Sequence, residues 1–313
     1  MRDLTPPVQQ RLHFGEVDIF LRSNWKQEFK KEDEVVVIHQ RNFFFNQKTN
    51  PDIVVDVELA KDAPRYHLKK RLFLSQHPEN KQEWWSWERG LGVYIYRANF
   101  SNRKQVAFIN PDFKYARVWC LPKDDGSQSW QFGDLLLTFL EVLLIHYLIH
   151  YKKGLLVHAC GINDALKGGL LFLGASGTGK STLARLWYHQ NKKEVLNDDR
   201  IIVAKKNKVF FIYPTLWSGE FNKYLSMPLR PAPLKAIFFL RKSKQNYARP
   251  ILPSLSLSQL LPATFIPFWD KLLSGNALGL CEELLNSIPV FSLDFVKSRS
   301  VVGYIKRLEI KRF

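Results

Sequence analysis

The segment Gly174-Ala-Ser-Gly-Thr-Gly-Lys-Ser-Thr182 constrains the fold of this chain more than any other feature. It matches the pattern GxxxxGK[ST] in full, with an apolar run over 169–173 before it and a helix-forming run over 182–187 after it. Glycines permit a tight turn that points backbone N–H groups inward, and the start of a helix adds the positive end of its dipole. The sequence therefore predicts a strand, a phosphate-binding loop and a helix, in this order.

Residues of this loop have predicted roles in binding ATP. Lys180 places a cation against the β- and γ-phosphates, and Ser181 offers its hydroxyl to Mg²⁺. The predicted nucleotide-binding residues are Gly174, Ala175, Ser176, Gly177, Thr178, Gly179, Lys180, Ser181 and Thr182. The expected cofactors are therefore ATP and Mg²⁺.

Three further side chains are candidates for the chemistry. Asp198 and Asp199 interrupt an apolar run, and adjacent strand residues point to opposite faces, so both serve one site only if the strand ends there and the chain turns. One carboxylate, Asp198, can then hold the metal while Asp199 takes a proton from an acceptor hydroxyl; alternatively, one of the two caps a turn. His158 lies on the strand expected over 154–160. It is either at the ligand-binding end of the sheet or a core histidine.

The chain divides at a turn-rich segment over 122–129. Residues 1–128 read as a mostly β N-terminal domain, for which peptide or substrate docking is one role; residues 129–313 read as an α/β P-loop domain that begins with a helix over 131–151. Trp84, Trp85 and Trp87 are clustered in the first half. They either pack between sheet faces or form a platform for an extended peptide.

The charge of the chain limits the classes of partner that the protein is expected to bind. The net charge is +17, and residues 151–313 hold 25 Lys and Arg against 10 Asp and Glu. Such a field attracts ATP with an acidic acceptor, or nucleic acid, or serves only solubility. The basic clusters at 205–208 and 241–244 lack interleaved aromatic residues, which argues against nucleic acid as the partner.

Other features of the sequence indicate the cellular compartment in which the protein is expected to function. The three cysteines are far apart and form no CxxC pattern, which argues against a disulfide framework or a zinc site and is typical of the cytoplasm. The N-terminus does not resemble a signal peptide. The apolar stretch 134–151 contains Asp134, Glu141, His146 and His150, so we expect a buried helix and no membrane span.

Three motifs together resemble a known family: Leu156-Val-His-Ala-Cys-Gly-Ile162, Gly174–Ser181 and Asn197-Asp-Asp-Arg200. They are similar to the catalytic core of the HPr kinase/phosphorylase superfamily, most closely to the HPr-kinase-related P-loop kinases of lasso-type peptide-modification clusters. The likeness covers about residues 150–220 well. The sequence around Gly177 also resembles that of phosphoenolpyruvate carboxykinases, but this chain is too short to be one.

The resemblance implies a fold and a set of roles. It implies an HPr-kinase-like α/β P-loop domain in which Asp199 is the general base toward an acceptor serine and His158 lies at the active site. It also implies a later glutamate as metal ligand, here Glu220, and a downstream basic residue, either Arg230 or Arg241. The glycine-rich downstream signature of true HPr kinases is absent, so HPr, phosphorylase activity and a hexamer are not carried over.

The sequence therefore predicts a serine kinase that transfers the γ-phosphoryl group of ATP to a peptide or protein. Two alternatives stay open: a kinase for a small metabolite, and a nucleotide-gated binding module for an anionic partner such as nucleic acid. A motor ATPase is disfavoured because the chain shows no second motor element. A homo-oligomer is compatible with all of these.

Overall fold

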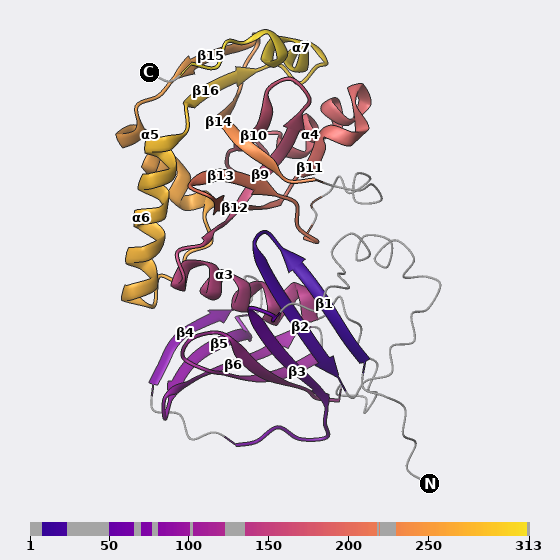
Figure 1. Ribbon diagram of the computed structural model, residues 1–313, viewed down its shortest axis with the longest axis vertical. Coiled ribbons are helices and arrows are strands. Elements are labelled where there is room, and N and C mark those ends of the chain that lie inside the picture. The colour runs from indigo at the N-terminus through magenta and orange to yellow at the C-terminus, as the bar shows by residue number, and fades with distance from the viewer. Residues whose placement is uncertain are drawn as a thin grey trace.

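The computed structural model describes residues 8–23, 50–65, 70–76, 81–100, 103–122, 135–217, 219 and 230–311. Two strand-rich parts lie one above the other, with helix α3 (Glu141–His150) between them (Figure 1). The apolar run over 34–39, all but the first residue of the predicted boundary over 122–129, and the residue Glu220 lie outside the described residues.

The amino-terminal part is one eight-stranded sheet with the order β1-β2-β3-β8-β7-β6-β5-β4. Strands β2, β3 and β8 run parallel to one another and the other neighbours are antiparallel. In β2 every second residue is buried, as alternation in the sequence predicts. The strands are β1 (Val8–Phe14), β2 (Val17–Ser23), β3 (Ile53–Leu59), β4 (Lys70–Gln76), β5 (Glu83–Gly90), β6 (Val93–Phe100), β7 (Arg103–Ile109) and β8 (Tyr115–Cys120).

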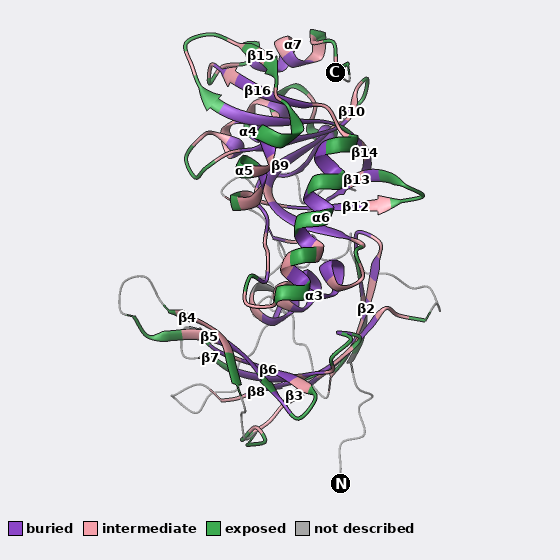
Figure 2. Ribbon diagram, turned by 90° about the vertical axis from the view of Figure 1, so that its left-hand side faces the viewer, coloured by how far each residue is buried: buried purple, intermediate pink, exposed green. Residues whose placement is uncertain are grey.

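Helix α3 lies on the concave face of this sheet (Figure 2). It follows a short π-helical turn, η2 (Leu136–Leu140), and its ring of His146 stacks on Trp87 of β5 at 4.2 Å between centroids. The predicted buried helix is therefore present over 135–150. His146 is only 1% exposed and its Nδ1 donates to the Val142 carbonyl, while Glu141 pairs with Arg200 at 2.9 Å.

The carboxyl-terminal part contains the remaining strands and helices. Its strands are β9 (Gly154–Asp164), β10 (Gly168–Leu173), β11 (Val195–Asn197), β12 (Arg200–Lys206), β13 (Val209–Tyr213), β14 (Ala232–Lys242), β15 (Tyr247–Pro250) and β16 (Val290–Phe295). Its helices are α4 (Lys180–Gln190), η3 (Lys192–Glu194), α5 (Pro253–Leu260), η5 (Leu261–Ala263), α6 (Lys271–Ser287) and α7 (Ser300–Arg307). The expected order of strand, loop, helix and strand is observed as β10, 174–179, α4 and β11.

Strand β9 determines where the candidate site forms. Its second half pairs antiparallel with β10, with Ala159 opposite Leu173, whereas its first half pairs with β12, with His158 opposite Arg200. Strands β10, β14 and β16 are parallel, so their carboxyl ends meet at one edge. His158 therefore lies level with the carboxyl end of β10, where the phosphate loop begins.

Two buried clusters stabilise the fold. One cluster packs α4 and α7 against β10, β14 and β16. The other is continuous from β1 through α3 to α6, so the two strand-rich parts share one apolar core. The elements that carry the candidate site are thus held against both halves of the chain.

Candidate phosphoryl-transfer site

The loop over 174–179 requires glycine at two positions for reasons of space and backbone angle. A side chain at Gly174 would place its Cβ 2.6 Å from Thr178 Oγ1. Gly179 has φ +117°, and its Cβ would lie 2.8 Å from the Phe295 ring. Gly177 has φ +75° in open space. The sequence pattern thus corresponds to a backbone path that other residues adopt only with strain.

The amide groups of this loop are available to an anion. Within the described part of the chain, the loop N–H groups of Gly177 and Gly179 and the first-turn N–H groups of Lys180 and Ser181 donate to no backbone carbonyl. Thr178 closes the loop instead, donating through its N–H and its hydroxyl to the carbonyl of Ala175, at 3.2 and 2.8 Å. Unpaired N–H groups at a helix N-terminus suit phosphate oxygens.

Lys180 lies at the start of α4 with its ammonium turned into the loop. The group donates to the carbonyls of Gly174 at 2.8 Å and Ala175 at 3.4 Å and is 6% exposed as a residue. Burial lowers the pKa of Lys180 below its ordinary value, while the negative charges of Asp199 and Asp198 act in the opposite direction. The charge of Lys180 is thus coupled electrostatically to both aspartates.

Asn197 produces the turn that brings the two aspartates into one site. Its Oδ1 accepts from the backbone N–H groups of Asp199 at 2.8 Å and Arg200 at 3.2 Å. Its Nδ2 donates to the carbonyls of Thr215 and Trp217. Strand β11 ends at Asn197 and β12 begins at Arg200, so both aspartates lie in the break between strands, as the adjacency of two acids predicts.

His158, Asp199 and Arg200 form a contact group around one oxygen atom. His158 Nε2 lies 3.0 Å from Asp199 Oδ1, and Arg200 Nη1 lies 2.8 Å from the same atom. Neither contact uses Oδ2, for which no hydrogen bond is present in the described ranges. Of the two interpretations of His158, the structure places it beside Asp199, with its side chain 37% exposed, and not in the core.

The electrostatic surroundings keep Asp199 charged. Burial alone would raise the pKa of its carboxyl. The hydrogen bond from His158 and the positive charges of Arg200, His158 and Lys180 outweigh burial, so the pKa of Asp199 lies below its ordinary value. Asp199 is therefore an ionised carboxylate near neutral pH.

Arg200 and Glu141 are site residues to which the sequence assigned no role. Arg200 Nε donates to Glu141 Oε1 at 2.9 Å, while Nη1 holds Asp199, so one guanidinium bridges two carboxylates from different elements. Burial raises the pKa of Glu141, and Arg200 opposes this. The available signal was Glu141 itself: an acidic residue in an otherwise apolar helix needs a partner.

The predicted metal ligands are only partly placed. Asp198 is 1% exposed and its Oδ1 accepts the Gly219 N–H at 3.0 Å. Ser181 lies in the first turn of α4, and Glu220 is outside the described residues. No cluster of three or more His, Cys, Asp or Glu side chains suited to a metal occurs within the described ranges. Mg²⁺ usually takes only one or two protein carboxylates and completes its shell with phosphates and water.

The two candidates for the downstream basic residue, Arg241 and Arg230, lie at opposite edges of the sheet. Strand β14 runs parallel to β10, with Leu173 opposite Phe239, so Arg241 lies at the carboxyl edge near the loop. Arg241 pairs there with Asp294 at 3.3 Å. Arg230 precedes β14 and lies at the opposite edge. Lys297, to which the sequence assigned no role, lies beside the loop: a Cβ on Gly179 would lie 3.4 Å from its Cε.

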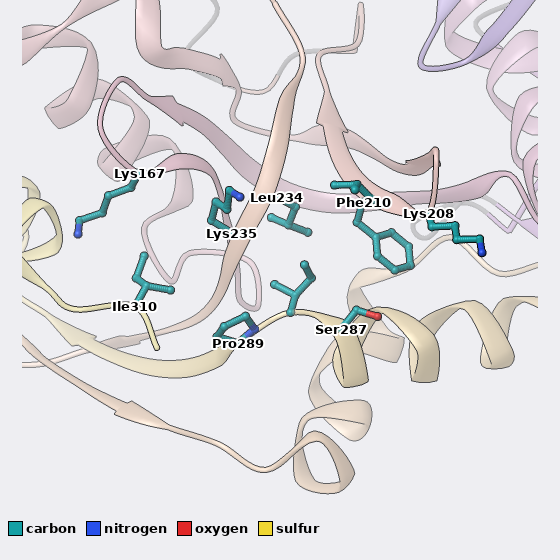
Figure 3. A pocket seen from close by; sticks show the side chains of 10 residues that line it. Lys167, Lys208, Phe210, Leu234, Lys235, Ser287, Pro289 and Ile310 are labelled. Carbon is teal, nitrogen blue, oxygen red and sulfur yellow. The ribbon is translucent and has the colours of Figure 1, made fainter. Parts of the chain in front are cut away.

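Figure 3 shows the lining of a second cavity, of about 610 Å³, to which none of the candidate site residues contributes. Leu234 lines it from the start of β14, opposite Gly169 at the start of β10. Lys167, Lys208 and Lys235 also line it. Nearby, Lys205 pairs with Glu283 at 2.7 Å and Lys206 with Glu16 at 3.0 Å. Two lysines of the cluster at 205–208 are thus neutralised within the protein, which weakens the argument for a nucleic-acid surface.

Comparison with known proteins adds no assignment. No family model matches the chain, and no curated protein matches it. Among the described helices, none is both long and apolar enough to cross a membrane.

Proposed function

We propose that the protein is an ATP-dependent kinase that transfers the γ-phosphoryl group to a hydroxyl, with serine in a peptide or protein as the acceptor. The observation that carries the proposal is the Asp199 carboxylate, whose Oδ1 is held by His158 and Arg200 while Oδ2 carries no such contact. A general base needs this combination of a fixed position and one available oxygen.

The proposed reaction is an in-line displacement. The acceptor oxygen forms a bond to the γ-phosphorus, the bond from that phosphorus to the oxygen bridging the β-phosphate breaks, and ADP leaves. The proton of the acceptor hydroxyl moves to Asp199 Oδ2. Lys180 and the loop N–H groups stabilise the charge on the phosphate oxygens.

Mg²⁺ neutralises phosphate charge when bound, and Ser181 and Asp198 are the described residues that would hold it. The buried Asp198 is fixed by the Gly219 N–H and lies close enough to Lys180 to influence its pKa. Arg241 and Lys297 lie at the same edge and are the candidates for the additional basic residue.

The test is transfer of label from γ-labelled ATP into a cell extract that is separated into macromolecules and small molecules. Lys180→Met removes the ammonium and keeps the volume of this buried side chain, and Lys192→Met, on an exposed lysine beyond the end of α4, is the control. Label in a peptide or protein that Lys180→Met abolishes supports the proposal. Label only in small molecules contradicts the peptide acceptor, and label in neither fraction, with ATP bound, contradicts the kinase.

A further inference from the structure

A groove of about 950 Å³ opens between the amino-terminal sheet and the segment 261–269. We call it the aromatic groove. Its lining includes Phe73, Trp85, Phe265, Phe268, Trp269 and Arg200. Its volume falls in the range of sites that enclose a ligand of a few residues or a drug-sized molecule.

The wall of the aromatic groove is a packed set of rings. Phe73 stacks on Trp269 at 4.3 Å between centroids and meets Phe268 edge-on at 5.4 Å. Trp85 lies 4.8 Å from Phe73. Phe268 is 70% exposed although it belongs to this set. An apolar occupant would remove that aromatic surface from water, which is the main source of affinity in such sites.

The aromatic groove is continuous with the proposed catalytic group. The Phe265 N–H donates to the Leu156 carbonyl at 3.0 Å, and Thr264 bridges to Val157, so the wall is attached to β9 next to His158. The Arg200 guanidinium lies 4.4 Å from the centroid of the Phe265 ring while its Nη1 holds Asp199. One side chain thus lines the groove and positions the proposed base.

Two polar atoms in the wall favour a peptide over an apolar alcohol. His146 Nδ1 donates to the Val142 carbonyl, which leaves Nε2 as an acceptor, and Trp269 Nε1 is a donor. Both atoms are buried and have no hydrogen-bond partner in the part of the chain that the structure describes. The surrounding side chains cover both atoms, so a peptide group in the groove pairs with this donor and this acceptor only when the rings of the wall shift.

The position of β4 favours an extended peptide as well. In the order of the described strands β4 is at the edge of its sheet, and both Phe73 and Ser75 reach the groove from it. An edge strand offers backbone groups to a peptide in extended conformation.

We propose that the aromatic groove binds the acceptor peptide through large apolar residues next to the serine and so delivers the hydroxyl to Asp199 Oδ2. This inference rests on the proposed function. It defines the substrate class as a serine peptide with bulky apolar or aromatic flanking residues. The inference also assigns different roles to the clustered tryptophans. Trp87 is buried in the packing of the sheet, whereas Trp84 and Trp85 line the groove.

Two pools of short fluorescent peptides test the inference by binding. Each peptide carries one serine and acidic ends; flanking residues are drawn from Phe, Leu, Ile and Trp in the apolar pool and from Gln, Asn and Gly in the polar pool. We expect the wild-type protein to bind the apolar pool about tenfold more tightly, which is about 1.4 kcal/mol. Phe268→Ser and the filling substitution Ser75→Trp should remove this preference, and Tyr247→Ser, an exposed aromatic residue on β15, should not.

The outcomes separate this inference from the proposed function. Equal binding of both pools, binding of neither, or a preference that survives both groove substitutions overturns the inference. Selective binding of the apolar pool without transfer of phosphate contradicts the kinase and leaves the groove in place. Transfer to both pools at equal rates supports the kinase and overturns the role of the groove.

Discussion

His158 Nε2 lies 3.0 Å from Asp199 Oδ1, on the oxygen atom that also accepts from Arg200. The imidazole comes from the middle of β9, and the carboxylate comes from the break between β11 and β12. Their contact exists because β12 pairs with β9 with Arg200 opposite His158. The register of one strand pair therefore positions the proposed base, and several expectations depend on it.

Replacing Arg200 is expected to shift the acid limb of the pH profile of phosphoryl transfer to higher pH. In the wild-type protein the positive neighbours hold the pKa of Asp199 below 3.8, so the carboxylate stays ionised as pH falls through that value. In Arg200→Gln the opposing effect of burial is less compensated, so the pKa rises and transfer is lost at a higher pH. The pH profile of kcat/KM measures this, and an unmoved acid limb would show that Arg200 does not set the charge of the base.

Removing the loop ammonium is expected to abolish stabilisation by nucleotide. A ligand at about a hundred times its Kd stabilises a protein by about 2.7 kcal/mol, which raises Tm by several degrees. Lys180→Met should lose this rise with ATP and Mg²⁺, because the substitution removes the ammonium that the loop holds at the Gly174 carbonyl. Lys192→Met should keep it. A full shift in Lys180→Met would contradict ATP binding at this loop.

The sequence predicted the loop, its flanking strand and helix, and the turn at the aspartate pair, because each depends on local residues with narrow conformational choices. It did not predict the contact of Arg200 with Glu141, which joins residues far apart in the chain. Nor did it identify strand β4 or the segment 261–269, whose aromatic residues acquire their role only by packing against each other across the two halves. For His158 the sequence left two positions open, because the neighbours of this residue depend on strand register.

Two glycine-to-alanine substitutions distinguish the steric and backbone constraint in the phosphate loop from the general preference of helices for alanine over glycine. Gly179→Ala should cost about 1–3 kcal/mol of unfolding free energy, because φ is +117° and the new Cβ would lie 2.8 Å from Phe295. It should also weaken ATP binding. Gly275→Ala lies in α6 with no atom near its Cβ, so it should stabilise by up to about 1 kcal/mol. Denaturant unfolding compares them, and equal effects would count against the strained loop.

The buried His146 should make the fold sensitive to acid. Burial lowers its pKa from 6.5 to about 4, so below pH 6.5 the unfolded chain takes up a proton that the folded protein refuses. Stability from this group is therefore lost as pH falls from 6.5 to about 4, by about 3 kcal/mol.

His146→Phe keeps a ring against Trp87 and removes the titration. Denaturant unfolding at several pH values should show a shallower loss of stability in this variant than in the wild type. Parallel losses in the two proteins would mean that His146 does not titrate as its burial requires.

If Asp199 acts as a base on an acceptor while the phosphate loop holds ATP, one variant separates the two functions. Asp199→Asn keeps the size and the contact geometry of the side chain and removes its ability to accept the proton. We predict that it binds ATP and Mg²⁺ within about threefold of the wild-type affinity while transfer of the γ-phosphoryl group falls by a factor of about 10²–10⁴. Transfer at the wild-type rate by Asp199→Asn, with ATP bound, would show that Asp199 is not the base.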